Sequence, residues 1–238
     1  MQIALSVENL SKTYGQLIAL EQVSLSIPAG TSLGLAGLNG AGKTSLLRCI
    51  LNFTHSDHGD INIFGIPATH DEARQSIAYV PERFSGPAYL TGLEYLRFQM
   101  QLEGKTLDEH QSNELAKHLD LDRSALKRML RSYSKGMTQK LGLLAALISK
   151  RNLLILDEPM SGLDPQARTY VRNELQAHRA KGGSLFFTSH ALDDIDLLCD
   201  NMAILHQGKI IYSGSCEHLR QRTQQTDLTS AFLRLIGQ

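Results

Sequence analysis

A chain of 238 residues has room for one large α/β domain, or for a core domain with a smaller insert. Lysine plus arginine equal aspartate plus glutamate at 24 each, so the chain has no overall field that would attract nucleic acid or anionic lipid. The three cysteines, Cys49, Cys199 and Cys216, are scattered and odd in number, which favours free thiols in a reducing compartment over disulfides.

The sequence shows no targeting or membrane-spanning pattern. Its first residues lack the cationic start and the long apolar run of a secretion signal. The longest apolar stretch, residues 141–148, is far below the roughly 20 residues that cross a bilayer. We therefore expect a soluble, cytoplasmic protein.

The first 83 residues alternate short strands with one helix. Apolar runs, alternating or continuous, predict strands over residues 3–10, 23–27, 31–36, 60–64 and 77–80. A helix is predicted over residues 43–51, soon after the third of these strands. This order is typical of an α/β core.

Residues 84–150 change to a helical pattern. Capping boxes opened by Thr91 and Thr106 mark two helix starts in this stretch. The four helices predicted here cover residues 94–102, 106–118, 122–130 and 135–148. We interpret the stretch as a helical insert in a core that comprises residues 1–83 and 151–238.

Parallel-sheet patterns return after the insert. Strands are predicted over residues 153–157, 184–188 and 202–206, and helices over residues 165–181 and 191–198. Asp164 is a natural N-cap for the first of these helices, with Pro165 at its first position. The alternation predicts an α/β fold with a mostly parallel sheet.

Residues 37–44, GLNGAGKT, match the phosphate-binding loop pattern G-x-x-x-x-G-K-[ST] without compromise. Such a loop wraps a nucleoside triphosphate in backbone N–H groups, and its glycines allow positive φ and close approach. Lys43 is expected to reach the β- and γ-phosphates, and the Thr44 hydroxyl to ligate Mg²⁺. The predicted phosphate-binding set is Gly37, Leu38, Asn39, Gly40, Ala41, Gly42, Lys43, Thr44 and Ser45.

Two acids end the strand predicted over residues 153–157. Asp157 is expected to hold Mg²⁺ through its water shell, beside the phosphate loop. Pro159 stops the ladder and is expected to keep Glu158 extended, so that Glu158 can take a proton from an attacking water. His190, at the end of the next strand, is expected to donate to a γ-phosphate and to that water. The alternatives are a solvated acid pair and a structural histidine.

Together these motifs resemble the ATP-binding cassette family, the motors of ABC transporters, over essentially the whole chain. The resemblance implies a phosphate-loop NTPase fold with an N-terminal antiparallel β subdomain and an inserted helical subdomain, in one domain of residues 1–238. Residues 134–139, SKGMTQ, stand where the family has its LSGGQ signature. The resemblance places Ser134 and Gly136 against the γ-phosphate bound by the opposite subunit. It also adds Tyr14, which would stack on adenine, and Asp164 to the ATP-binding residues.

The chain departs from the family pattern at three positions. Lys135 and Met137 replace two residues of the signature, and Glu82 replaces the glutamine that usually links Mg²⁺ to the membrane partner. As a carboxylate, Glu82 is still a suitable Mg²⁺ ligand. These variants are similar to a branch whose single-domain cassettes pair with separate exporter-type permeases.

The phosphate loop and the signature are expected on opposite sides of the molecule, so each ATP needs a second subunit. We expect a head-to-tail dimer, either of identical chains or with a second cassette, that closes on two ATPs. Hydrolysis by Glu158, His190 and Lys43 with Mg²⁺ would reopen it. Residues 84–101 are the expected contact with an integral membrane permease, which would hold the protein at the cytoplasmic face of the membrane.

Two other functions fit parts of the pattern. A cassette that serves DNA repair or translation usually carries long coiled-coil inserts or two tandem cassettes, and no basic face for nucleic acid is evident here. A non-hydrolysing, ATP-sensing regulatory subunit would explain the changes at Glu82, Lys135 and Met137, although intact Glu158 and His190 argue against it.

Overall fold

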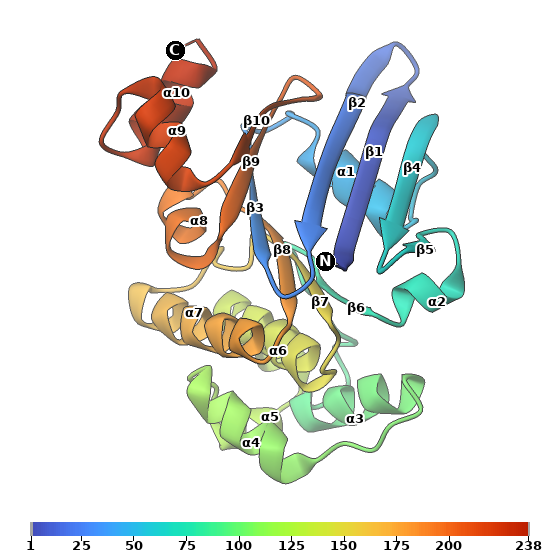
Figure 1. Cartoon of the computed structure of the whole chain (residues 1–238). Coiled ribbons are helices and arrows are strands. Elements are labelled where there is room, and N and C mark those ends of the chain that lie inside the picture. The colour runs from blue at the N-terminus through green and yellow to red at the C-terminus, as the bar shows by residue number, and fades with distance from the viewer. Residues whose placement is uncertain (1, 238) are drawn as a thin grey trace.

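The computed structural model describes residues 2–237, and its centre is a six-stranded sheet in the order β10-β9-β3-β8-β7-β6 (Figure 1). The neighbours from β9 to β6 are parallel, while β10 pairs antiparallel with β9 at one edge. The strands are β3 (Ser32–Ala36), β6 (Ile77–Val80), β7 (Leu153–Asp157), β8 (Ser184–Thr188), β9 (Asn201–His206) and β10 (Lys209–Gly214). Every residue of β3 and β8 is buried, as expected for strands covered on both faces. The predicted α/β fold with a mostly parallel sheet is confirmed.

A second, antiparallel sheet of four strands lies beside the core sheet (Figure 1). Its order is β2-β1-β4-β5, with β1 (Ile3–Tyr14), β2 (Leu17–Pro28), β4 (His58–Ile63) and β5 (Ile66–Pro67). Its buried side chains form one apolar cluster with α1 (Lys43–Ile50) and with residues from one face of the core sheet. The short helix α2 (Asp71–Arg74) follows β5. This is the predicted N-terminal antiparallel subdomain.

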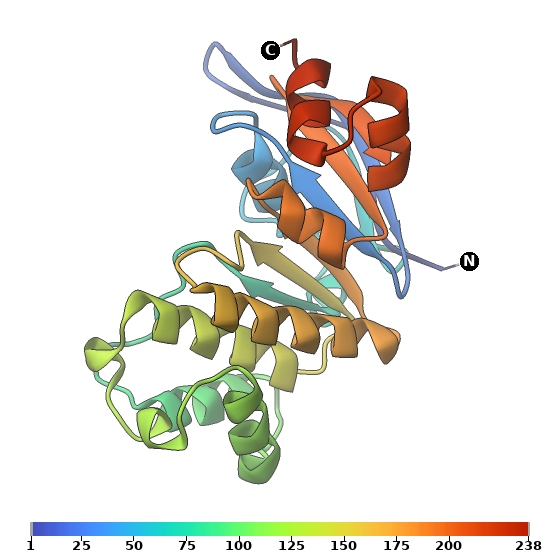
Figure 2. The ribbon, with the colours of Figure 1, turned by 90° about the vertical axis from the view of Figure 1, so that its left-hand side faces the viewer.

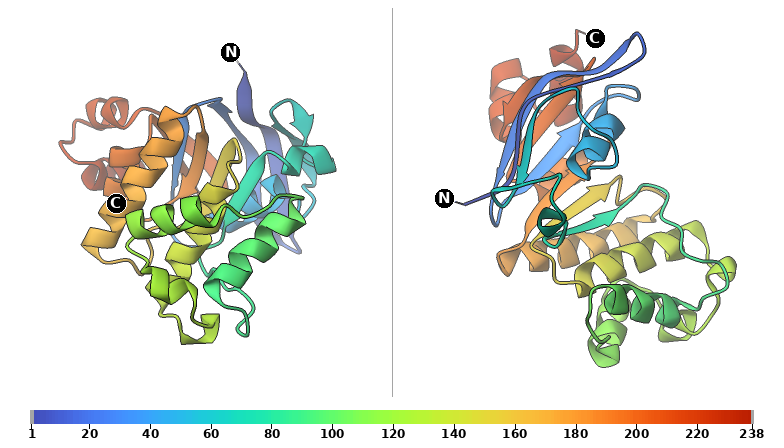
Figure 3. Two further views of the ribbon diagram at one scale, coloured as in Figure 1. Left: turned by 90° about the horizontal axis from the view of Figure 1, so that it is seen from below. Right: turned by 90° about the vertical axis from the view of Figure 1, so that its right-hand side faces the viewer.

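The helical insert lies at the opposite end of the molecule from the tip of the β1–β2 hairpin (Figure 3, right). It contains α3 (Gly92–Leu102), α4 (Glu109–His118), α5 (Arg123–Leu126), a 3₁₀ turn (Leu130–Ser132) and α6 (Lys135–Ile148). The capping box of Thr91 with Glu94 is present, as predicted. The prediction for Thr106 is wrong: Asp108 caps α4, its Oδ1 accepting the Gln111 N–H at 3.0 Å. Asp is as good an N-cap as Thr and stands two residues closer to the first helical turn.

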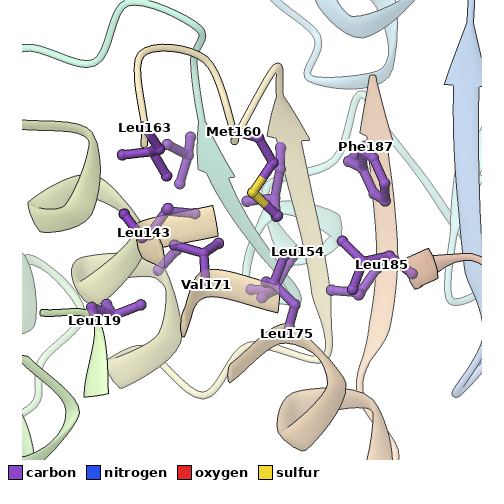
Figure 4. Packing of buried hydrophobic residues seen from close by; sticks show 14 of the residues in the cluster. Leu119, Leu143, Leu154, Met160, Leu163, Val171, Leu175, Leu185 and Phe187 are labelled. Carbon is purple, nitrogen blue, oxygen red and sulfur yellow. The ribbon is translucent and has the colours of Figure 1, made fainter. Parts of the chain in front are cut away.

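The helix α7 (Pro165–Ala180) packs with α6 against one face of the core sheet (Figures 2 and 4). Figure 4 shows Leu143 of α6 beside Val171 of α7, with Leu154 and Leu185 of the sheet in the same apolar cluster. The remaining helices are α8 (Leu192–Leu198), α9 (Cys216–Thr223) and α10 (Leu228–Leu235). None of the helices within residues 2–237 combines the length and the apolar character that crossing a membrane requires.

Candidate functional site

The phosphate loop lies between the end of β3 and the start of α1, and beside it is a pocket of about 290 Å³. We call this the nucleotide pocket. Tyr14 and the acids Glu82, Asp157 and Glu158 line it. Most of the predicted loop residues line it too, namely Leu38, Asn39, Gly40, Gly42, Lys43, Thr44 and Ser45. Gly37 and His190 line an adjoining pocket that shares Leu38, Asn39, Glu82 and Glu158. The fold therefore gathers residues from five separate segments of the chain at one edge of the core sheet.

The loop glycines have different reasons for being glycine. Gly40 has φ +81° and a Cβ there would meet no atom within 4 Å, so the left-handed backbone and not a steric contact favours glycine at this position. Gly42 has φ +110°, and a Cβ would lie 2.5 Å from the carbonyl oxygen of Ala19. The prediction of positive φ is wrong for Gly37, where a Cβ would instead lie 2.5 Å from the Leu205 carbonyl oxygen. Packing against β9 therefore excludes a side chain at Gly37.

Lys43 begins α1 and turns back over the loop. Its Nζ donates to the carbonyl oxygen of Gly37 at 2.6 Å and is 3.3 Å from that of Leu38. No acidic residue stands in the first turn of α1. The ammonium and the positive end of the helix therefore lie together at the loop, which suits a bound polyphosphate.

Asp157 is partly buried at the end of β7, opposite Thr188 of β8 in the parallel register. The Thr188 hydroxyl donates to Asp157 Oδ1 at 2.6 Å. Burial raises the pKa of Asp157, and the Thr188 hydrogen bond lowers it. The negative charge of Glu82 raises this pKa, and the positive charge of Lys43 lowers it. The carboxylates of Glu82 and Asp157 and the Thr44 hydroxyl thus line one pocket, and this set of oxygen donors fits a hard cation such as Mg²⁺.

Glu158 is not extended, and that prediction is wrong. Its φ is +48°, in the left-handed region that non-glycine residues seldom occupy. Its N–H donates to the Thr188 carbonyl oxygen at 3.2 Å and to the Thr188 hydroxyl at 3.1 Å, and its carbonyl accepts the Ser161 N–H. These contacts turn the chain sharply after β7, so a tertiary contact overrides the local preference set by Pro159.

The turn directs Glu158 to His190. The distance from Glu158 Oε2 to His190 Nδ1 is 2.7 Å, and the His190 N–H also donates to Oε2 at 3.3 Å. The Glu158 side chain is 12% exposed and that of His190 is 71% exposed. A carboxylate held by an imidazole at the rim of a phosphate pocket can accept a proton from a water molecule there.

Ser134 and Gly136 lie outside the nucleotide pocket of their own chain. Ser134 caps α6, its hydroxyl accepting the Met137 N–H at 3.2 Å. A Cβ at Gly136 would lie 3.4 Å from the Gly162 carbonyl oxygen, and one at Gly162 would lie 3.2 Å from the Lys135 side chain. The start of α6 therefore rests against the segment that precedes α7, and Lys135 lies across it.

Asp164 also lies outside the nucleotide pocket and acts as a helix cap. Its Oδ1 accepts the Ala167 N–H at 2.8 Å, with Pro165 at the first helical position as predicted. This backbone hydrogen bond lowers the pKa of Asp164. Sequence reasoning missed Thr188, although a hydroxyl two residues before His190, at the end of the strand beside β7, was the available signal.

Comparison with known proteins gives a consistent result. The family described as ABC transporter matches residues 20–161, which is more than half of the chain. An uncharacterised ABC transporter ATP-binding protein of Synechocystis sp. is 38% identical over 83% of this chain and 56% of its own. The Nod factor export ATP-binding protein I of Sinorhizobium fredii is 34% identical over 89% of this chain and 63% of its own. The chain thus spans about three fifths of the length of these two relatives.

Among solved structures, one described as the ATP-binding subunit of an ABC transporter is similar to the whole fold. It superposes with a TM-score of 0.90, covers 98% of this chain and 99% of its own, and is 29% identical. The similarity includes both sheets and the helical insert, since almost no part of either chain is left out.

Proposed function

The chain belongs to the ABC transporter family of ATP-binding proteins, and we propose that it is the ATP-hydrolysing subunit of an export system that works through a separate permease. The observation that carries the proposal is the Glu158–His190 pair, placed at the rim of the nucleotide pocket and next to Asp157. Such a pair provides a proton acceptor where an attacking water must stand.

Each residue of the pocket has a part in this proposal. The loop N–H groups and Lys43 bind the phosphates, while Thr44, Asp157 and Glu82 hold Mg²⁺. When bound, Mg²⁺ neutralises charge on the phosphate oxygens. Glu158 takes the proton of the attacking water, and His190 holds the carboxylate in place. Tyr14, which is exposed beside the loop, stacks on the adenine ring.

The second half of the site comes from another subunit. Ser134 and Gly136 start α6 away from the nucleotide pocket of their own chain, so they complete the pocket of a partner in a head-to-tail dimer. The free N–H groups of the first turn of α6 then meet the γ-phosphate, and Asp164 lies at the same interface. ATP closes this dimer and hydrolysis opens it.

The permease contact is proposed at residues 84–101, the first part of the helical insert in the domain of residues 1–238. A groove of about 560 Å³ runs from Glu82 through Phe84 to Arg131 and Lys135 at the start of α6. Tyr89 and Phe98 expose apolar rings on this part of the insert. A membrane partner seated here would place the protein at the cytoplasmic face of the membrane. The direction of transport is inferred from the Sinorhizobium relative, whose name states export.

Substitution of Glu158 by Gln tests the proposal. We expect ATP binding to persist, turnover to fall by at least about 10² as a general base is lost, and dimers to accumulate with MgATP. Phosphate release and light scattering after size exclusion measure the two effects. Glu72→Gln is the matched control, because Glu72 is exposed on α2 and does not line the nucleotide pocket.

Unchanged hydrolysis in Glu158→Gln would exclude Glu158 as the proton acceptor. Wild-type protein that binds ATP and releases no phosphate would instead favour the regulatory subunit over the motor. The same assay thus separates a hydrolysing motor from a non-hydrolysing regulatory subunit.

A further inference from the structure

A buried carboxylate stands in the first turn of α8, the helix that follows His190 in the chain. Asp194 is 5% exposed, and its two oxygens face two arginines of α7. Oδ1 is 3.7 Å from Arg172 Nη2, and Oδ2 is 3.9 Å from Arg168 Nη1. These distances are about 1 Å longer than those of charge-assisted hydrogen bonds. Within residues 2–237, Asp194 Oδ2 has no hydrogen-bond partner.

Stability alone is a poor explanation for this group. Burial raises the pKa of Asp194, and the positive charges of Arg168 and Arg172 lower it. Replacing buried ion pairs by neutral side chains of similar volume is often neutral or stabilising, because desolvation offsets the attraction. The two ion pairs of this buried carboxylate exceed hydrogen-bond distance, so we look for its reason in the segments that it joins.

The connections of Arg168 supply that reason. Its Nε donates to the carbonyl oxygen of Leu163 at 3.2 Å, and Leu163 belongs to the short segment that joins Glu158 to α7. Its Nη1 faces Asp194, which follows His190 by four residues. Arg168 therefore bridges the segment that carries Glu158 and the helix that begins directly after His190.

The position of the His190 ring depends on its backbone, because few side chains pack against the ring. Its ring is 71% exposed, so packing does little to hold it against Glu158. Ala191, the N-cap residue of α8, offers no side-chain acceptor to the first turn of the helix. The position of the ring thus depends on where α8 begins, and Asp194 is the charged anchor of that first turn.

We propose that Asp194 and Arg168 are positioning residues, which hold the start of α8 so that His190 stays within hydrogen-bond distance of Glu158 during ATP hydrolysis. The inference rests on the proposed function, because it assigns the two residues a part in the same reaction. The interaction acts through backbone segments, and neither residue lines the nucleotide pocket.

The test compares Asp194→Asn with Asp193→Asn. Both remove one carboxylate from the first turn of α8, but Asp193 is exposed and Asp194 is buried. We expect Asp194→Asn to lower kcat about 10-fold with KM for ATP within about twofold, since misplacement of a reacting group costs rate rather than binding. Buried Leu192, Ile195 and Leu198 should keep α8 folded in both variants.

A second readout uses no nucleotide. Hydrogen exchange of a peptide covering residues 189–196 should be faster in Asp194→Asn than in wild type, and unchanged in Asp193→Asn. The double variant His190→Gln/Asp194→Asn should have the same kcat as His190→Gln alone, because Asp194 acts on the reaction only through His190. If Asp194→Asn does not fold, Arg168→Lys replaces it in the test, because the Arg168 side chain is partly exposed. We expect the same fall in kcat in Arg168→Lys.

Wild-type kcat in Asp194→Asn, unchanged exchange of residues 189–196, or full additivity with His190→Gln would each overturn the inference. So would wild-type kcat in Arg168→Lys. Wild-type protein without ATPase activity would refute the proposed function itself, whereas an active wild type with an equally active Asp194→Asn would refute only the positioning role.

Discussion

Thr188→Val is the substitution whose effect the structure specifies most closely. Valine keeps the shape of the fully buried threonine and removes the hydroxyl that donates to Asp157 Oδ1 at 2.6 Å. Hydrogen bonds to charged groups contribute about 1.5–3 kcal/mol, and we expect a loss of about 2 kcal/mol of unfolding free energy at pH 7. For a chain of this size that lowers Tm by roughly 4–8 °C. Thr223→Val is the control, since the buried Thr223 hydroxyl donates to the neutral Leu219 carbonyl; it should cost about 1 kcal/mol.

The pH dependence separates the two variants. Burial raises the pKa of Asp157, and the Thr188 hydrogen bond opposes that rise, so Thr188→Val should raise the pKa further. A carboxyl whose pKa is higher in the folded than in the unfolded state contributes to the free energy of unfolding at pH values below its unfolded pKa. That contribution is lost as the pH rises through the folded-state pKa. The loss of unfolding free energy in Thr188→Val should therefore be largest near pH 7 and should shrink toward about pH 4. Calorimetry over this pH range measures the loss. A deficit equal to that of Thr223→Val at every pH would refute the reasoning.

The other predictions concern the two half-sites. Ser134→Ala should lower the free energy of unfolding by about 1 kcal/mol, because the N-cap of α6 is lost. It should also impair hydrolysis and dimer closure and leave nucleotide binding to the monomer intact. Fluorescent-nucleotide titration measures that binding, and a loss of monomer affinity would place the signature in its own chain's site. Gly42→Ala should abolish ATP binding, because its Cβ would lie 2.5 Å from the Ala19 carbonyl oxygen at φ +110°. Gly15→Ala, with φ +61° and open space, should cost about 1–2 kcal/mol and leave ATP binding intact, so equal loss in both variants would contradict the steric argument.

The sequence predicted best the elements whose patterning is local. The strands β6, β7 and β8 and the helix α6 lie at the predicted bounds. Each is a short apolar run between polar or turn-forming residues, or begins at a capping serine. The strands β1 and β2 run longer than predicted, to Tyr14 and from Leu17, because the hairpin pairs Thr13 with Ile18, beyond the alternating segments at residues 3–10 and 23–27. Cross-strand pairing, unlike periodicity, is not visible in a single segment.

In the candidate site, the missing information was tertiary. The phosphate loop and the acids at 157 and 158 could be found by pattern, and the fold gathers them in one pocket. The run from Ala191 to Leu198 contains three acids, and nothing in the sequence distinguishes buried Asp194 from exposed Asp193 and Asp196. Which of them faces the arginines of α7 depends on how two helices pack, a relation between segments some 25 residues apart.

Thr188 connects the two parts of the chemistry that we propose for the site. Successive side chains of a strand point to opposite faces, so Asp157 and Glu158 can share one pocket only if the backbone turns between them. The turn places Glu158 at φ +48°, a conformation that costs on the order of 1–3 kcal/mol in a non-glycine residue. The Thr188 hydroxyl accepts the Glu158 N–H at 3.1 Å while it donates to Asp157. One side chain thus favours the ionised form of Asp157, the proposed cation ligand, and supports the turn that directs Glu158 to His190, so its loss should affect both.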